Sequence, residues 1–463
     1  MIPTFVKQIL RFLGFDRAVS FGILARLWSL VAGPVTMMVI ATGFSPEEQG
    51  FYYTFSSLLA LQIFFDLGLM FVISQFTSHE FVHLAWGPSG TVVGEPIAMK
   101  RFNDLLRKTV LWFGVAALLM IAILVPAGFF FFGQKGIVTF PWRLPWTLAV
   151  VGTALNLLVM PFFAIISGSG DVVTANKRDL VGTVLSSILC WLVIGLHGGL
   201  YAAFAVNFGV LIVSWGYLVT KRPKLLMFVW KGRFGNDSAW SDEPGLSWWG
   251  EIWPMQWRIA ISAGASYFMF QLFNPILFHY QGPVVAGKMG MTLSAANALL
   301  AGCMTVLNAK TPQLCKLIAI NDWPQLDREF TKATSHACLL AVCGMIAGIF
   351  LIWLLQMNRG IGQRFLPVLE VSFLLAAICI QIVITALAVY LRAHKREPLM
   401  KVTVVVSLLQ GLTTWLGAKF YGSFGATLGF FCVTIFFMLP SVFYVWKKCK
   451  TEWHHNETVG EHA

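Results

Sequence analysis

The chain has 463 residues, of which 57% are hydrophobic and only 12% are charged, and its formal net charge is +12. A water-soluble protein of this length needs a much larger charged surface to stay dispersed, so the composition excludes a soluble protein. The positive charge lies mainly on linkers between apolar stretches, where membrane insertion accounts for it. Nucleic acid is therefore not an expected partner.

Twelve apolar stretches follow one another along the chain. Each is close to the ~20 residues that cross ~30 Å of hydrocarbon as a helix, and none alternates as a membrane β-strand does. We therefore predict an all-α polytopic membrane protein with about 12 transmembrane helices. The predicted spans are 21–43, 51–74, 109–133, 145–168, 179–197, 199–220, 254–281, 289–308, 334–355, 365–391, 398–419 and 425–446.

Most of the 33 Lys and Arg residues lie on alternate linkers. Because cytoplasmic loops carry the excess of positive charge, both termini are predicted to be cytoplasmic. Near the N-terminus, Ile2, Phe5 and Ile9 recur at helical spacing opposite Lys7 and Arg11, which indicates an interfacial helix.

The two halves of the chain share several sequence features at corresponding positions. Each half opens with a span that contains one arginine (Arg26 or Arg258) and one interior proline (Pro34 or Pro275). Two equal six-helix lobes are typical of carriers in which one lobe rocks against the other. The predicted organisation is an interfacial helix at 1–20, an N-lobe at 21–220, a cytoplasmic linker at 221–253, a C-lobe at 254–446 and a cytoplasmic tail at 447–463.

The six-plus-six spans, these two arginines and the string Phe64-Phe65-Asp66-Leu67-Gly68-Leu69 together resemble the multidrug/oligosaccharidyl-lipid/polysaccharide (MOP) superfamily. The chain is most similar to its polysaccharide-type flippases, the O-antigen translocase group, over residues 10–446. The resemblance implies a MATE-like fold with two pseudo-symmetric bundles. It also implies a function: moving an undecaprenyl-pyrophosphate-linked glycan across a bacterial inner membrane for O-antigen, lipopolysaccharide or polysaccharide biosynthesis. The implied partners are that lipid-linked glycan, the membrane lipids and membrane enzymes of polysaccharide synthesis.

Arg26 and Arg258 are the candidate substrate-binding residues. A charged side chain at the bilayer centre costs ~2.5–3.5 kcal/mol on insertion scales and usually marks a transport pathway. Relatives have an arginine-lined cavity, and two guanidinium groups suit the oxygens of a pyrophosphate. The alternative is that both arginines lie near the cytoplasmic face and extend to the interface.

Asp66 and Glu370 are the candidate gate or coupling residues. Three roles are open for Asp66. It forms a structural salt bridge with Arg26, it acts as a gate that releases Arg26 when substrate binds, or it carries a proton. Glu370 is a candidate proton or cation site, and the alternative is a solvated residue at the periplasmic interface. No cofactor is expected, and coupling to a proton or Na⁺ stays open.

Further polar residues and the two prolines are also candidates. Gln62, Asn156, Gln271 and Asn274 either join helices by hydrogen bonds or face the lumen. Pro34 and Pro275 are predicted hinges, with static kinks as the alternative.

No catalytic function is predicted. The outer loops are short and hold no obvious acid–base pair, which disfavours a membrane polysaccharide polymerase or ligase. No GxxxxGK[ST] phosphate loop is present, and the eight cysteines include no CxxC pair. The main alternative is a cation-coupled multidrug exporter of the same superfamily, whose lumen would be acidic rather than basic.

Overall fold

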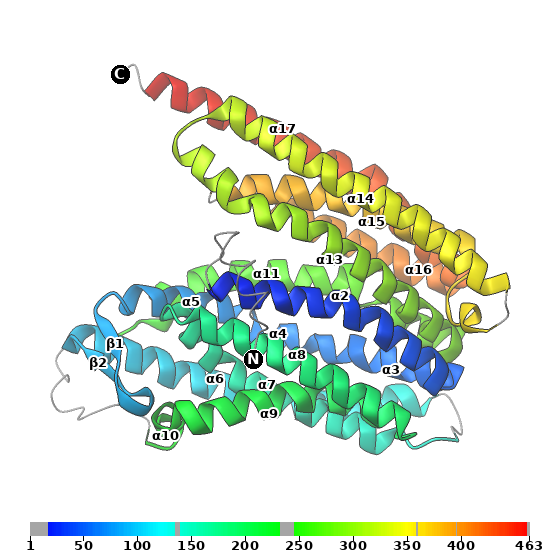
Figure 1. Cartoon of the computed structure of the whole chain (residues 1–463), viewed down its shortest axis with the longest axis horizontal. Helices are drawn as coiled ribbons and strands as arrows, with labels where there is room; N and C mark the ends of the chain where they lie inside the picture. Colours follow the sequence, from blue (N-terminus) through cyan, green and yellow to red (C-terminus); the bar gives the residue numbers. More distant parts are fainter. Residues whose placement is uncertain (1–16, 135–138, 232–244, 358–359, 395, 461–463) are drawn as a thin grey trace, which may run out of the picture. The chain divides into compact units, whose positions relative to one another are not determined.

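The described part of the chain, residues 17–134, 139–231, 245–357, 360–394 and 396–460 of a computed structural model, is built almost entirely from α-helices (Figure 1). The predicted interfacial helix at 1–20 lies outside these ranges except for its last four residues, which begin the first described helix.

The first half of the chain contains these elements. They are α2 (Arg17–Gly43), α3 (Pro46–Leu59), the short helices η1 (Ala60–Gln62) and α4 (Ile63–Asp66), α5 (Leu69–Glu80), β1 (Leu84–Trp86), η2 (Pro88–Gly90), β2 (Val92–Gly94), α6 (Pro96–Gly133), α7 (Arg143–Gly168), α8 (Val172–Gly195), α9 (Tyr201–Lys221) and α10 (Pro223–Lys231). The two strands pair antiparallel, with Leu84 opposite Gly94. The sequence had given no sign of this hairpin.

The second half is helical throughout its described residues. Its elements are the π-helical turn η4 (Trp248–Ile252), α11 (Trp253–Phe270), α12 (Phe273–Gln281), α13 (Pro283–Ala319), α14 (Trp323–Met357), η5 (Ile361–Arg364), α15 (Val368–Ala393), α16 (Met400–Val433), η6 (Thr434–Met438) and α17 (Leu439–Gly460).

Within the described residues, nine helical segments are long and apolar enough to cross a membrane, or ten when the bent pair Pro46–Asp66 and Leu69–Glu80 is one span. One of these segments, Met400–Trp453, contains a chain reversal at Gly422, which has φ +64°. Thr413 lies against Gly429 across this reversal, so the segment forms two antiparallel helices. The predicted total of about twelve crossings stays a prediction, whereas the repeated long apolar helices of the described residues show the multi-pass helical architecture. The protein is a multi-pass α-helical membrane protein.

Large apolar side chains point outward from several of these helices. Leu118 on α6 is 70% exposed, and Ile346 and Phe350 on α14 are each 60% exposed. A soluble protein rarely leaves such surfaces uncovered, whereas lipid tails solvate them.

Contacts divide the chain into two compact units. Unit 1 comprises Met1–Val39 and Leu58–Gly264, and unit 2 comprises Ile40–Ser57 and Ala265–Ala463. The division runs through α2, α3 and α11 instead of through the linker 221–253, so residues 40–57 join the later helices. The predicted lobe boundaries, with 221–253 as the cytoplasmic linker between the lobes, stay a prediction.

Unit 1 is centred on α7, whose Trp146 is fully buried with Phe113 and Phe132 of α6. Helices α8 and α9 lie side by side and α7 packs on α9 (Figure 1). Helix α2 packs on α8, where Trp191 donates a hydrogen bond of 2.8 Å to Thr36.

In unit 2, α3 and α13 approach so closely that backbone meets backbone. A Cβ added to Gly50 would overlap the carbonyl oxygen of Pro283, and Gly287 lies against Gly50. The buried Gln49 donates to the Gly287 carbonyl at 2.8 Å and to the Arg364 carbonyl at 3.2 Å. Small residues permit such close packing of membrane helices, and polar groups then add to it.

Candidate functional site

The two candidate arginines, Arg26 on α2 and Arg258 on α11, both have exposed side chains. Neither forms an ion pair with an acidic residue that the structure describes, and the Arg258 guanidinium lies 5.6 Å from the ring centre of Trp257. The sequence predicts one arginine from each lobe, whereas the contacts place both in unit 1. Two cations within apolar spans thus have no protein counter-ion among the described residues.

Asp66 ends the short helix α4 at a break in the bent span α3–α5. Leu67 and Gly68 adopt left-handed conformations, with φ values of +51° and +67°. A Cβ added to Gly68 would overlap the Ile259 side chain of α11, so glycine is required both by the conformation and by the close approach. The break therefore lies against the helix that carries Arg258.

The Asp66 carboxylate caps α5 rather than pairing with an arginine. It accepts a hydrogen bond from the Met70 backbone N–H, while its Oδ1 atom is buried without a hydrogen-bond partner. The ion pair between Asp66 and Arg26, one of the predicted alternatives, is not formed between these two described residues. Broken helices in membrane proteins occur where the freed backbone is buried in protein or lines a cavity, so this break is a candidate site in its own right.

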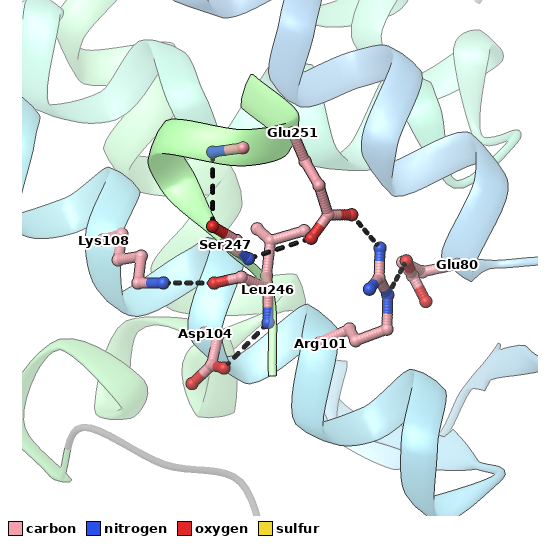
Figure 2. A network of polar contacts seen from close by, with 8 residues as sticks. Glu80, Arg101, Asp104, Lys108, Leu246, Ser247 and Glu251 are labelled. Atoms are coloured by element: carbon pink, nitrogen blue, oxygen red, sulfur yellow. Dashed lines mark hydrogen bonds and ion pairs between the residues drawn. The ribbon is translucent and has the colours of Figure 1, made fainter. Parts of the chain in front are cut away.

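The start of α11 is fixed to unit 1 by a set of polar contacts, which we call the α11 clamp. Figure 2 shows Arg101 of α6 between two carboxylates: it donates to Glu80 at 2.8 Å and to Glu251 at 2.6 Å. One and two turns further along α6, Asp104 accepts from the Leu246 N–H at 3.2 Å and Lys108 donates to the Leu246 carbonyl. The clamp holds the chain where it re-enters the membrane domain, about two to three turns before Arg258.

Glu251 also belongs to a local capping arrangement. Its carboxylate accepts from the Ser247 N–H at 2.9 Å, and the Ser247 hydroxyl accepts from the Gly250 N–H at 3.2 Å. Partial burial raises the pKa of Glu251, but the hydrogen bonds from Arg101 and Ser247 outweigh it, so this pKa lies below its ordinary value. The carboxylate is thus held charged beside Arg101.

One polar residue of this region was missed by the sequence analysis. Gln256 of α11 is fully buried, and both polar atoms of its amide are without a hydrogen-bond partner. An unpaired buried amide costs ~1–3 kcal/mol and calls for an explanation, such as a partner in another state of the protein. Its sequence signal was a lone glutamine one turn after the clamp, in an apolar helix.

The burial of Glu370 contradicts one of its two predicted alternatives, that of a solvated residue at the interface. Glu370 lies in the first turn of α15 and is only 8% exposed. The Ser423 hydroxyl donates to its carboxylate and Lys288 lies near enough to attract it, while Oε2 is buried without a hydrogen-bond partner. The turn at Gly422 folds Ser423 over the carboxylate, which explains the burial. Its role in coupling stays a prediction.

The two predicted hinge prolines behave differently. Pro34 lies inside the continuous helix α2. Pro275 lies in the first turn of α12, just after the interruption that separates α12 from α11. Pro275 has no N–H to donate to the Gln271 carbonyl four residues earlier, so the helix is interrupted there. Whether either position moves stays a prediction.

Two of the four predicted polar residues form hydrogen bonds between elements, and the other two lie half-buried at helix interruptions. Asn156 donates to the Asn207 carbonyl at 2.9 Å and so joins α7 to α9. Asn274 is buried and donates to the Ser57 hydroxyl at 3.0 Å. Gln62 and Gln271 are half-buried at helix interruptions. Within the described ranges, no group of three or more His, Cys, Asp or Glu side chains is arranged to hold a metal ion.

Comparison with known proteins identifies the fold. No family model and no curated protein sequence matches the chain. Among solved structures, it is similar to an inward-facing multidrug resistance MATE family transporter of the MOP superfamily, with a TM-score of 0.61 and 11% identity over 94% of this chain and 99% of that one. The lipid II flippase MurJ, in an inward closed conformation, gives a TM-score of 0.58 and 14% identity over 93% of this chain and 87% of that one.

A third similar structure is a MOP superfamily transporter from Pyrococcus furiosus, for which reversed polarity of the binding pocket suggests a different function. It gives a TM-score of 0.54 and 12% identity over 95% of this chain and 96% of that one. These likenesses extend over nearly the whole chain and confirm the all-α architecture predicted from the sequence. The protein has the fold of the multidrug and flippase transporters of the MOP superfamily.

Proposed function

We propose that the protein is a MOP superfamily transporter that flips a lipid-linked oligosaccharide with a pyrophosphate head group across the bacterial inner membrane. The observation that supports this most directly is the pair Arg26 and Arg258, two exposed cations within membrane spans that pair with none of the described acids. Such residues carry an insertion cost, and an anionic substrate offsets it. The chemistry therefore favours an anion over a cationic drug.

A pyrophosphate suits two guanidinium groups because its oxygens are spread over two phosphorus centres. Each guanidinium donates two parallel hydrogen bonds to such a group, which fixes orientation as well as charge. The glycan part follows from the resemblance to the O-antigen translocase group. In this proposal both termini are cytoplasmic, and a membrane-bound glycan-synthesis enzyme supplies the substrate.

The test uses purified protein in liposomes that contain an undecaprenyl-pyrophosphate glycan with a fluorescent label. R26Q and R258Q should each slow translocation by about 10- to 100-fold, the range expected for loss of a hydrogen-bonded charge. R143Q is the matched control, because Arg143 also lies 5.6 Å over the ring of the preceding residue, Trp142, but outside the proposed site. Wild-type rates in both arginine variants would overturn the proposal.

A cation-coupled exporter is the second candidate function. It is favoured by the buried oxygens of Asp66 and Glu370 that have no hydrogen-bond partner, because such carboxylates can take up a proton or a cation. The same liposomes, loaded with a cationic dye and given a proton or Na⁺ gradient, distinguish the two. Gradient-driven dye efflux that is lost in D66N and kept in R26Q would establish the exporter.

A further inference from the structure

Unit 2 contains a basic cavity that shares no residue with the candidate site. It lies where α13 and α15 end and α17 passes them, and its volume is about 340 Å³. Its walls combine two arginines, one tryptophan and several small or apolar side chains. The lining residues that matter here are Arg392, Arg396, His394, Trp453, Ile318 and Ala319.

Aromatic stacking makes one wall of this cavity rigid. The His394 ring stacks on Trp323 with centroids 6.1 Å apart and an interplanar angle of 14°. It also lies 5.0 Å from Trp453, and its Nδ1 atom is 3.0 Å from the Tyr390 carbonyl oxygen. The Arg396 guanidinium lies 5.1 Å over the Trp453 ring, so the stack fixes its position.

The two arginines differ in how far their charges are already compensated. Arg392 donates three hydrogen bonds to Glu397, at 2.9–3.2 Å. Arg396 forms no ion pair with any acid in the part of the chain that the structure describes. Arg396, which has no acidic partner among the described residues, therefore borders the cavity beside Arg392, a second guanidinium that a bound anion would share with Glu397.

The position of Arg392 has a simpler explanation: it lies in the last turn of α15, where a positive charge compensates the helix dipole. That explanation does not extend to Arg396, which lies beyond the helix end and stacks on a tryptophan of another helix. Compensation of the helix dipole also does not account for the cavity between α13, α15 and α17.

The surroundings match the boundary between lipid and water. Ala319 and Cys315 are exposed on α13, and the neighbouring Ile320 is 60% exposed. Tryptophan is enriched at the depth of lipid head groups, and basic pockets between membrane helices bind anionic head groups. A ligand with a phosphate and an apolar chain satisfies both the arginines and this apolar strip.

We propose that this cavity binds the phosphate head group of an anionic phospholipid, with Arg396 and Arg392 on the phosphate and the start of an acyl chain along Ala319 and Ile320. This site is independent of the proposed transport function, since none of its residues belongs to the candidate site. Free phosphate shares the head-group chemistry but has no acyl chain to cover the apolar strip.

Native mass spectrometry of the purified protein tests the proposal, because it counts bound lipids directly. The probes are dioctanoyl phosphatidylglycerol, dioctanoyl phosphatidylcholine and inorganic phosphate. We expect phosphatidylglycerol to bind at least about tenfold more tightly than either of the others, and R392Q/R396Q to remove that preference. E397Q should tighten phosphatidylglycerol binding several-fold, because it releases the Arg392 guanidinium.

The matched control is K401Q/K447Q, which removes two positive charges from exposed positions of unit 2 outside the cavity. Its affinity for phosphatidylglycerol should stay within about twofold of wild type. Equal loss in K401Q/K447Q and R392Q/R396Q would overturn the site, since any surface charge would then suffice. Inorganic phosphate that binds as tightly as phosphatidylglycerol would overturn the lipid as occupant, and weaker binding in E397Q would overturn the role of Arg392.

Discussion

Arg101 and Glu251 lie 150 positions apart in the sequence and are joined by a hydrogen bond of 2.6 Å. This contact connects the start of α6 with the turn that leads into α11. It explains why the first half of α11, with Arg258, groups with unit 1 although it follows the linker 221–253.

Replacing Arg101 should destabilise the protein by about 1–2 kcal/mol. R101Q leaves the part-buried Glu80 and Glu251 without their shared donor, and partial exposure keeps the loss below that of a fully buried pair. Unfolding in mixed micelles measures the change. K448Q is the control, because the exposed Lys448–Glu452 pair at 3.8 Å should contribute little. An equal loss of unfolding free energy in R101Q and K448Q would contradict a stabilising role of the α11 clamp.

The contribution of Glu251 should depend on pH. Because the pKa of Glu251 is lower in the folded protein than its ordinary value of 4.5, its stabilising effect is fully present above about pH 4.5 and is lost as the pH falls through the folded-state value. The difference in unfolding free energy between wild type and E251Q should therefore shrink on acidification from pH 7 to below pH 4. A difference that grows on acidification would show that the sign is wrong.

Gly50 should not tolerate a side chain. G50A places a methyl group into the Pro283 carbonyl, and we expect a loss of at least about 1–3 kcal/mol because backbone has to shift. Gly114, in the middle of α6, has no neighbour within 4 Å of an added Cβ. G114A should be neutral or stabilising by up to ~1 kcal/mol. Thermal unfolding of the two variants, side by side, checks the contrast.

Two substitutions of Asp66 separate the effect of its capping hydrogen bond from the effect of its negative charge. D66N keeps an oxygen that accepts from the Met70 N–H, so it should fold with nearly wild-type stability, whereas D66A should lose about 1 kcal/mol with the cap. If the charge couples transport to a gradient, D66N also loses gradient dependence. Unfolding midpoints and liposome transport of both variants are the measurements. Equal stability of D66A and wild type would refute the capping role.

Asn156, which joins two helices, and Gln62, which does not, should respond differently to substitution by leucine. N156L removes the bond that joins α7 to α9 and should cost about 1 kcal/mol. The Gln62 side chain forms no hydrogen bond with another described residue, so Q62L should leave stability unchanged within about 0.5 kcal/mol. Unfolding free energies of both variants, compared with that of wild type, decide between packing and open positions.

The sequence was sufficient for the architecture because hydrocarbon imposes its length and polarity on every span. It was not sufficient for the local breaks. The left-handed pair Leu67–Gly68 depends on contact with Ile259, nearly two hundred residues later, and no local pattern encodes such a contact. The burial of Glu370 likewise depends on a turn at Gly422. The α11 clamp was hidden because its residues read individually as ordinary charges on linkers.

The reversal at Gly422 has a practical consequence for engineering the protein. Since the helices on either side are in contact from Thr413 and Gly429 up to the turn, they form one antiparallel hairpin with almost no connecting loop. A peptide tag inserted beside Gly422 would separate these helix ends and displace Ser423 from Glu370. Labels intended for topology mapping are better placed at the C-terminal end of α17, where the chain leaves the bundle (Figure 1).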